Sequence, residues 1–73
     1  MTELLRLLKQ VCPEVDFENQ GNLVSDGVID SLSIVKIIDV IELNYSIKLC
    51  GDDIIPENFE SLECILSMIN RLR

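Results

Sequence analysis

One run, residues 31 to 44, carries the strongest helical pattern in the chain and constrains its fold more than any other stretch. The apolar side chains that share one face of this expected helix are Ile34, Ile37, Ile38, Ile41 and Tyr45. A face this apolar belongs in a core. Leu32, Val35 and Leu43 fall on the other side, among charged residues. Stranded apolar side chains can mark a partner surface, although single exposed Leu or Val residues are also ordinary.

Two other segments show helical spacing. A first helix is expected at residues 3 to 12, because the residue before Pro13 disfavours helical geometry. Ser61 is expected to cap the last helix, which follows one short helical turn at residues 55 to 59. No stretch alternates with period two for long enough to form a strand.

Two loops connect these helices. Residues 13 to 30 show no sustained period, and a loop of this length in a small domain is uncommon unless it is functional or well packed. Residues 46 to 53 form a second loop, in which Ile47 and Leu49 are expected to point inward. We therefore expect a single all-α domain over residues 1 to 73. Its expected architecture is a small four-helix bundle with three main helices, one short helix and a long first loop.

The charge is strongly acidic, with 13 Asp and Glu residues against 6 Lys and Arg residues. Residues 14 to 35 and residues 49 to 70 contain no base. Such a surface repels phosphate backbones and anionic lipid and attracts basic protein surfaces, so nucleic-acid binding is not expected. No apolar run approaches membrane-spanning length, and membrane insertion is not expected either.

The cysteine and histidine content argues against a metal site. Cys12, Cys50 and Cys64 stand far apart and the chain contains no histidine, so the usual zinc spacings are absent. An odd number of cysteines without a signal peptide predicts a reducing, cytoplasmic setting. Cys12 and Cys64 are expected to be buried as small hydrophobic side chains.

The residue types that usually support catalysis are also scarce. No imidazole is available to activate Ser31 as a nucleophile, and Lys36 is the only base in its helix. Acid pairs such as Asp26 and Asp30 lie in a loop without an evident cleft, and so short a chain leaves little room for an enzyme-sized pocket. We therefore expect no enzymatic activity. A metal-dependent enzyme or calcium sensor is the weakest hypothesis, because the first loop lacks the alternating oxygen ligands of an EF-hand.

Ser31 lies where the first loop becomes a helix. From the local pattern, either Asp30 or Ser31 caps that helix, which is the usual role of Asp and Ser before a helical run. A serine at this position is exposed, and the neighbouring amides and the helix dipole favour a phosphate attached to its hydroxyl. Capping and attachment are compatible at one junction.

The triad Asp30-Ser31-Leu32 resembles the attachment motif of acyl carrier proteins. The string LVSDGVIDSL at residues 23 to 32 resembles the end of that family's first loop, and PENFESL at residues 56 to 62 resembles its short third helix and the start of its last. The likeness covers almost the whole chain. It implies that Ser31 carries 4'-phosphopantetheine, which a separate phosphopantetheinyl transferase attaches from coenzyme A.

The resemblance also implies how such a carrier works. The thiol of the arm holds an acyl or aminoacyl group as a thioester, and the domain, a monomer, presents it to a loading ligase and to downstream acyltransferase or synthase enzymes. The residues that the resemblance implies for recognition by the transferase and partners are Asp30, Leu32, Val35, Asp39 and Glu42. The residues that it implies for the acyl-chain interior are Ile34, Ile38, Ile41, Phe59, Leu62 and Ile65.

Two residues depart from the pattern of the carriers that serve fatty acid synthesis. Ser33 and Lys36 occupy positions where acids are common in those carriers. This favours a dedicated carrier in a specialised lipid or metabolite pathway. The alternative function is an unmodified, acidic helical interaction module that docks a basic partner, a kind of binding that salt weakens.

Overall fold

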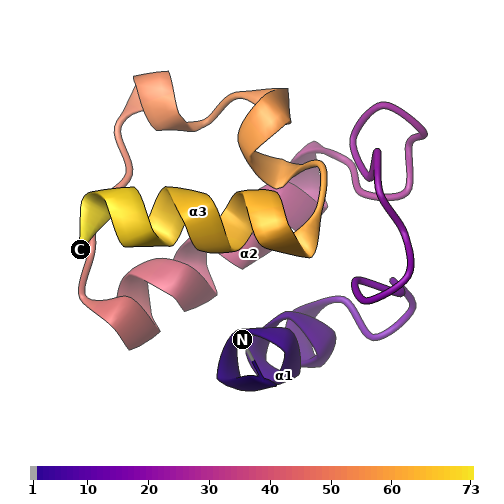
Figure 1. The fold of residues 1–73 in the computed structure, drawn as a ribbon, viewed down its shortest axis with the longest axis horizontal. Coiled ribbons are helices and arrows are strands. Elements are labelled where there is room, and N and C mark those ends of the chain that lie inside the picture. Colours follow the sequence, from indigo (N-terminus) through magenta and orange to yellow (C-terminus); the bar gives the residue numbers. More distant parts are fainter. Residues whose placement is uncertain (1) are drawn as a thin grey trace.

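The computed structural model describes residues 2 to 73, which form helices joined by loops and contain no strand. The elements are α1 (Thr2–Val11), α2 (Ser31–Tyr45), the 3-10 helices η1 (Gly51–Asp53) and η2 (Pro56–Phe59), and α3 (Leu62–Leu72). Figure 1 shows the α-helices around a shared interior, with the first loop along one side. The predicted all-α class is confirmed. Within the described range, none of the helices is both long and apolar enough to cross a membrane.

The ends of α1 and α2 lie within one residue of their expected positions. α1 ends at Val11, although the amide of Cys12 still donates to the carbonyl of Leu8 at 2.9 Å. Pro13 follows and cannot continue the helix. α2 runs to Tyr45, where Ser46 closes it with a left-handed backbone at φ 54°.

The start of α3 follows the predicted cap. The Ser61 hydroxyl accepts a hydrogen bond from the amide of Cys64 at 3.1 Å, which satisfies one of the free amides of the first turn. Pro56 occupies the start of η2, directly before α3, as the sequence predicted. Arg71 lies in the last turn of α3, where a positive charge suits the helix dipole.

A single apolar cluster drawn from all three α-helices and both loops forms the core. Its buried members are Leu4, Leu8, Cys12, Val15, Phe17, Leu23, Ile29, Ile37, Ile41, Ile47, Leu49, Phe59, Leu62, Ile65, Met68 and Ile69. In the described part of the chain no polar or charged side chain is buried. The burial of Ile37 and Ile41 confirms which face of α2 points inward.

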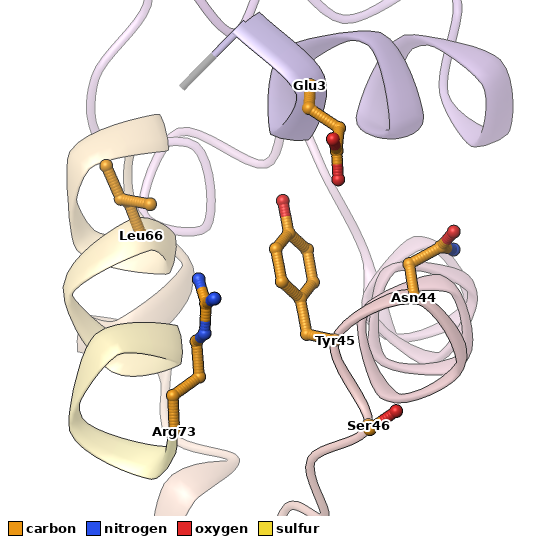
Figure 2. A pocket seen from close by; sticks show the side chains of 6 residues that line it. All are labelled: Glu3, Asn44, Tyr45, Ser46, Leu66 and Arg73. Atoms are coloured by element: carbon orange, nitrogen blue, oxygen red, sulfur yellow. The ribbon is translucent and has the colours of Figure 1, made fainter.

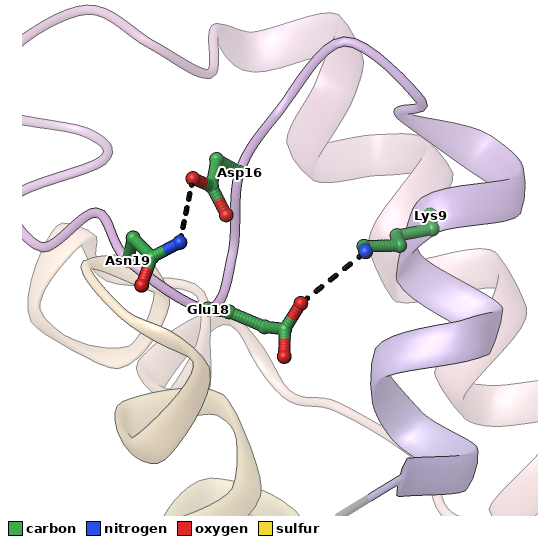
Figure 3. A network of polar contacts seen from close by, with 4 residues as sticks. All are labelled: Lys9, Asp16, Glu18 and Asn19. Atoms are coloured by element: carbon green, nitrogen blue, oxygen red, sulfur yellow. Dashed lines mark hydrogen bonds and ion pairs between the residues drawn. The ribbon is translucent and has the colours of Figure 1, made fainter.

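The first loop packs against the core through buried side chains of its own. The side chains that anchor it are Val15, Phe17, Leu23 and Ile29, all buried. At its surface Lys9 of α1 pairs with Glu18 at 3.3 Å, and Asn19 donates to Asp16 at 3.0 Å (Figure 3). An exposed ion pair contributes little, so apolar burial accounts for most of the anchoring.

The second loop is more ordered than the sequence indicated. Ile47 and Leu49 are buried, as predicted. The stretch Gly51–Asp53, expected to be irregular, forms η1. The Asp53 carboxylate accepts from the amide of Cys50 at 3.0 Å, while the Asp53 amide donates to the Cys50 carbonyl at 2.9 Å. These reciprocal hydrogen bonds close the turn.

Candidate functional site

Asp30 and Ser31 form the junction between the first loop and α2, and they differ in role. Asp30 is the N-cap, and its carboxylate accepts a hydrogen bond from the amide of Ser33 at 2.9 Å. Ser31 is the first helical residue and is exposed. The sequence left open which of the two caps the helix. Because Asp30 does so, the Ser31 hydroxyl is not needed for capping.

The electrostatics of this junction are set by the cap. The hydrogen bond from the Ser33 amide lowers the pKa of the Asp30 carboxyl below its ordinary value, because it stabilises the charged form. The positive end of the α2 dipole favours the same charge. Asp30 is therefore fully ionised at neutral pH, directly beside the exposed Ser31.

Ser31 stands at the edge of an apolar groove of about 430 Å³. The residues that line this groove are Val24, Ser31, Ile34, Val35, Ile38, Ile54, Ile55, Pro56 and Phe59. They come from the first loop, from α2, and from the segment that leads into η2. Ser31 is the only residue of this lining with a polar side chain, and the lining contains no base that could accept its proton.

The rim of the groove and the outer face of α2 carry exposed apolar side chains. Leu32 is 64% exposed, Val35 52% and Leu43 82%, which confirms that these residues point away from the core. Ile54 and Ile55 are exposed on the facing segment. These exposed apolar side chains come from α2 and from the segment before η2, which lie far apart in the chain.

The two charged residues on α2 that the resemblance implied for partner recognition differ in their surroundings. Asp39 is exposed. Glu42 is half-buried, and its carboxylate accepts a hydrogen bond from the Leu49 amide at 2.9 Å. This hydrogen bond ties the second loop to α2, so Glu42 has a structural partner within the chain.

The residues expected to line an interior fall into two groups. Ile34 and Ile38 are half-buried and line the groove. Phe59 is buried and also reaches it. Ile41, Leu62 and Ile65 are buried in the core and are not part of the groove lining.

Sequence reasoning missed residues on both sides of the groove. Val24, Ile54, Ile55 and Pro56 form much of its wall. The adjacent apolar pair Ile54-Ile55 before a proline was a local signal that could have indicated an exposed apolar edge. Glu60 was also missed. Its partners lie 35 and 36 residues away in the chain, and no local pattern indicates such a contact.

A second pocket lies at the other end of α2, about 21 Å from Ser31 along a helix of this length. Its volume is about 410 Å³, and Tyr45 stands between α1 and α3 with Glu3 and Arg73 on either side (Figure 2). The Arg73 guanidinium lies 5.6 Å from the centre of the Tyr45 ring. Burial raises the pKa of Tyr45, and the negative charge of Glu3 adds to this. The hydroxyl is therefore neutral at physiological pH and is not activated for chemistry.

The acids and cysteines give no metal centre within residues 2 to 73, where no group of three or more such side chains could hold an ion. The cysteines are free. Cys12 is buried as predicted, and burial raises the pKa of its thiol. Cys64 is half-buried, which corrects the expectation that it is fully buried. It lies in the first turn of α3.

Comparisons with protein-family models, with curated proteins and with solved structures give no match for this chain. The function of this chain is therefore inferred from the junction at Ser31, the groove beside it and the sequence motif.

Proposed function

We propose that this protein is a non-catalytic carrier that tethers an acyl or aminoacyl intermediate on a 4'-phosphopantetheine arm at Ser31. The observation that carries the proposal is the exposed Ser31 hydroxyl. It lies at a helix N-terminus and is not needed as the cap, because Asp30 caps the helix. The order of helices, with a long first loop and a short helix before the last, is in keeping with an acyl-carrier-type fold.

The attachment step needs a second protein. In it, the Ser31 oxygen attacks the pantetheine-bearing phosphorus of coenzyme A, a phosphodiester forms, and the pyrophosphate bond breaks to release the nucleotide. The serine proton passes to a base of the phosphopantetheinyl transferase, since the groove lining offers none. The first amides of α2 and the helix dipole stabilise the negative phosphodiester once it is formed.

The groove gives the arm and its cargo a surface to lie on. It is apolar apart from Ser31, so an apolar chain attached there loses contact with water when it folds back along Ile34 and Ile38. The exposed Leu32 and Val35 border the same region and would contact the enzymes that use the cargo. Tethering itself raises the effective concentration of the intermediate at those enzymes.

The proposal is tested by modification in vitro. The purified protein is incubated with coenzyme A, magnesium and a broad-specificity phosphopantetheinyl transferase, and its intact mass is measured. We expect a mass increase of one phosphopantetheine arm in the wild type and none in Ser31→Ala. The matched control is Ser33→Ala, which removes a neighbouring hydroxyl of α2 and is expected to leave the modification intact. An unmodified wild type, or a modified Ser31→Ala, would overturn the proposal.

One observation favours a second candidate, the unmodified interaction module. The outer face of α2 exposes Leu32, Val35 and Leu43 in a chain of net charge -7, a combination suited to a basic partner with apolar contacts. This candidate predicts a wild type that the transferase leaves bare and a complex that forms equally well with Ser31→Ala. Complex formation that requires the arm would exclude it.

A further inference from the structure

Glu60 holds the first loop in place through a compact set of hydrogen bonds. One oxygen of its carboxylate accepts from the amides of Val24 at 3.0 Å and Ser25 at 3.1 Å, and the other accepts from the Ser25 hydroxyl at 2.5 Å. The carbonyl of Glu60 accepts from the amide of Leu23 at 2.8 Å. Successive amides of the loop therefore converge on one residue between η2 and α3.

The held segment continues directly to Ser31. The Leu23 carbonyl accepts from the amides of Val28 at 2.9 Å and Ile29 at 3.1 Å. Ile29 is buried and immediately precedes the cap Asp30. An unbroken series of hydrogen bonds and peptide links thus runs from Glu60 to the candidate attachment site.

The same hydrogen bonds shape the groove. Val24, whose amide is held by Glu60, is the residue of the first loop that lines the groove next to Ser31. Gly27, in the turn between Val24 and Asp30, has φ 73°, a conformation that costs other residues energy. Besides the buried side chains that anchor this loop, Glu60 supplies polar contacts from outside the turn, through the hydrogen bonds from Leu23, Val24 and Ser25.

We propose that Glu60 is a positioning residue for attachment at Ser31, because it holds the first loop in the one conformation in which Ser31 and the groove wall are presented to the transferase. The inference rests on the proposed function and deepens it. Glu60 touches neither Ser31 nor the reacting phosphorus. Its effect is on the fraction of molecules that are ready to bind the enzyme.

The test compares transferase kinetics of Glu60→Ala, Glu60→Gln and the control Glu57→Ala. Glu57 is exposed on η2, so its replacement removes the same charge without touching the loop. For Glu60→Ala we expect the KM for the carrier to rise by roughly threefold to tenfold while kcat is retained, as when the competent conformation becomes a minor state. We expect Glu60→Gln to lie between the wild type and Glu60→Ala, since its amide oxygen can still accept from Val24 and Ser25 but carries no charge.

A second readout needs no transferase. Amide hydrogen exchange of Val24 and Ser25 is expected to accelerate in Glu60→Ala and to be unchanged in Glu57→Ala. Ser25→Ala, which removes only the hydroxyl contact, keeps the test open should Glu60→Ala fail to fold, and we expect a smaller rise in KM. Wild-type KM in Glu60→Ala with unaccelerated exchange, or a Glu60→Gln variant as impaired as Glu60→Ala, would overturn this inference alone. A wild type that cannot be modified would overturn the proposed function instead.

Discussion

At the scale of single residues, the junction at Asp30 and Ser31 shows how neighbouring polar side chains can divide two tasks. A helix N-terminus leaves amides without partners, and one short polar side chain is enough to satisfy one of them. Asp30 fills that role through the Ser33 amide, so the hydroxyl of Ser31 stays available. Because Asp30 accepts from the Ser33 amide, a covalent group on the Ser31 oxygen leaves the capping hydrogen bond intact.

The burial of each residue on α2 refines a stability prediction, because the sequence pattern alone did not distinguish fully buried from half-buried positions. The helical pattern treated Ile38 and Ile41 as equal core positions, but Ile41 is fully buried and Ile38 is half-buried at the groove. We expect Ile41→Ala to lower the free energy of unfolding by about 2–4 kcal/mol, the cost of a core truncation. Ile38→Ala should cost less, because part of its side chain is already in water. Urea unfolding at neutral pH measures both.

The control for these variants is Leu43→Ala. Leu43 lies on the same helix but is 82% exposed, so its truncation is expected to change stability by less than about 0.5 kcal/mol. A Leu43→Ala variant as unstable as Ile41→Ala would mean that the buried face of α2 is wrongly assigned.

At the scale of elements, the sequence predicted what depends on near neighbours and missed what depends on distant ones. The helices could be predicted from apolar spacing, from Pro13 and Pro56, and from the Ser61 cap, all of which act within a few residues. The groove could not, because its walls come from three separate segments. The contact of Glu60 with the first loop was equally invisible, because it depends on how the chain folds back on itself.

We expect low pH to destabilise the start of α2 and the first loop. Hydrogen bonds from the Ser33 amide to Asp30, and from Ser25 to Glu60, lower the pKa of each carboxyl below its ordinary value, 3.8 and 4.5 respectively. A group with a lowered folded pKa stabilises the protein above its unfolded pKa and loses that contribution as pH falls through the folded pKa. We therefore expect stability to fall progressively as pH drops below about 4.5, and the amides of the first loop to lose exchange protection with it.

Replacing a carboxyl by its amide separates these two groups from the other acids. Glu60→Gln does not titrate, so between pH 6 and pH 3 its urea midpoint should fall less than that of the wild type. The matched control is Glu57→Gln, which is expected to follow the wild-type pH dependence. Identical pH profiles for Glu60→Gln and the wild type would show that Glu60 does not stabilise the loop through its charged form.

At the scale of the whole molecule, charge and apolar surface are combined around one site. The net charge is -7, and the long stretch without a base, residues 14 to 35, contains the first loop, the cap and Ser31. Lys36 follows one turn later on α2 and is exposed. A partner that approaches Ser31 along the first loop therefore meets a stretch of the chain that carries acids and no base, with Lys36 five residues beyond Ser31.

This distribution predicts how attachment responds to salt. Attraction between the acidic carrier and a transferase with a basic docking face is screened as the Debye length shrinks from about 10 Å at 0.1 M to about 3 Å at 1 M salt. We expect kcat/KM for the carrier to fall by about tenfold over that range, the low end for electrostatically steered association.

Lys36→Glu should raise kcat/KM at low salt, because it replaces a positive charge that repels the basic enzyme with a negative charge that attracts it. At high salt the variant and the wild type should converge. A Lys36→Glu effect that is equal at both salt concentrations would point to a local contact at that side chain, and a rate indifferent to salt would exclude electrostatic steering by the acidic surface.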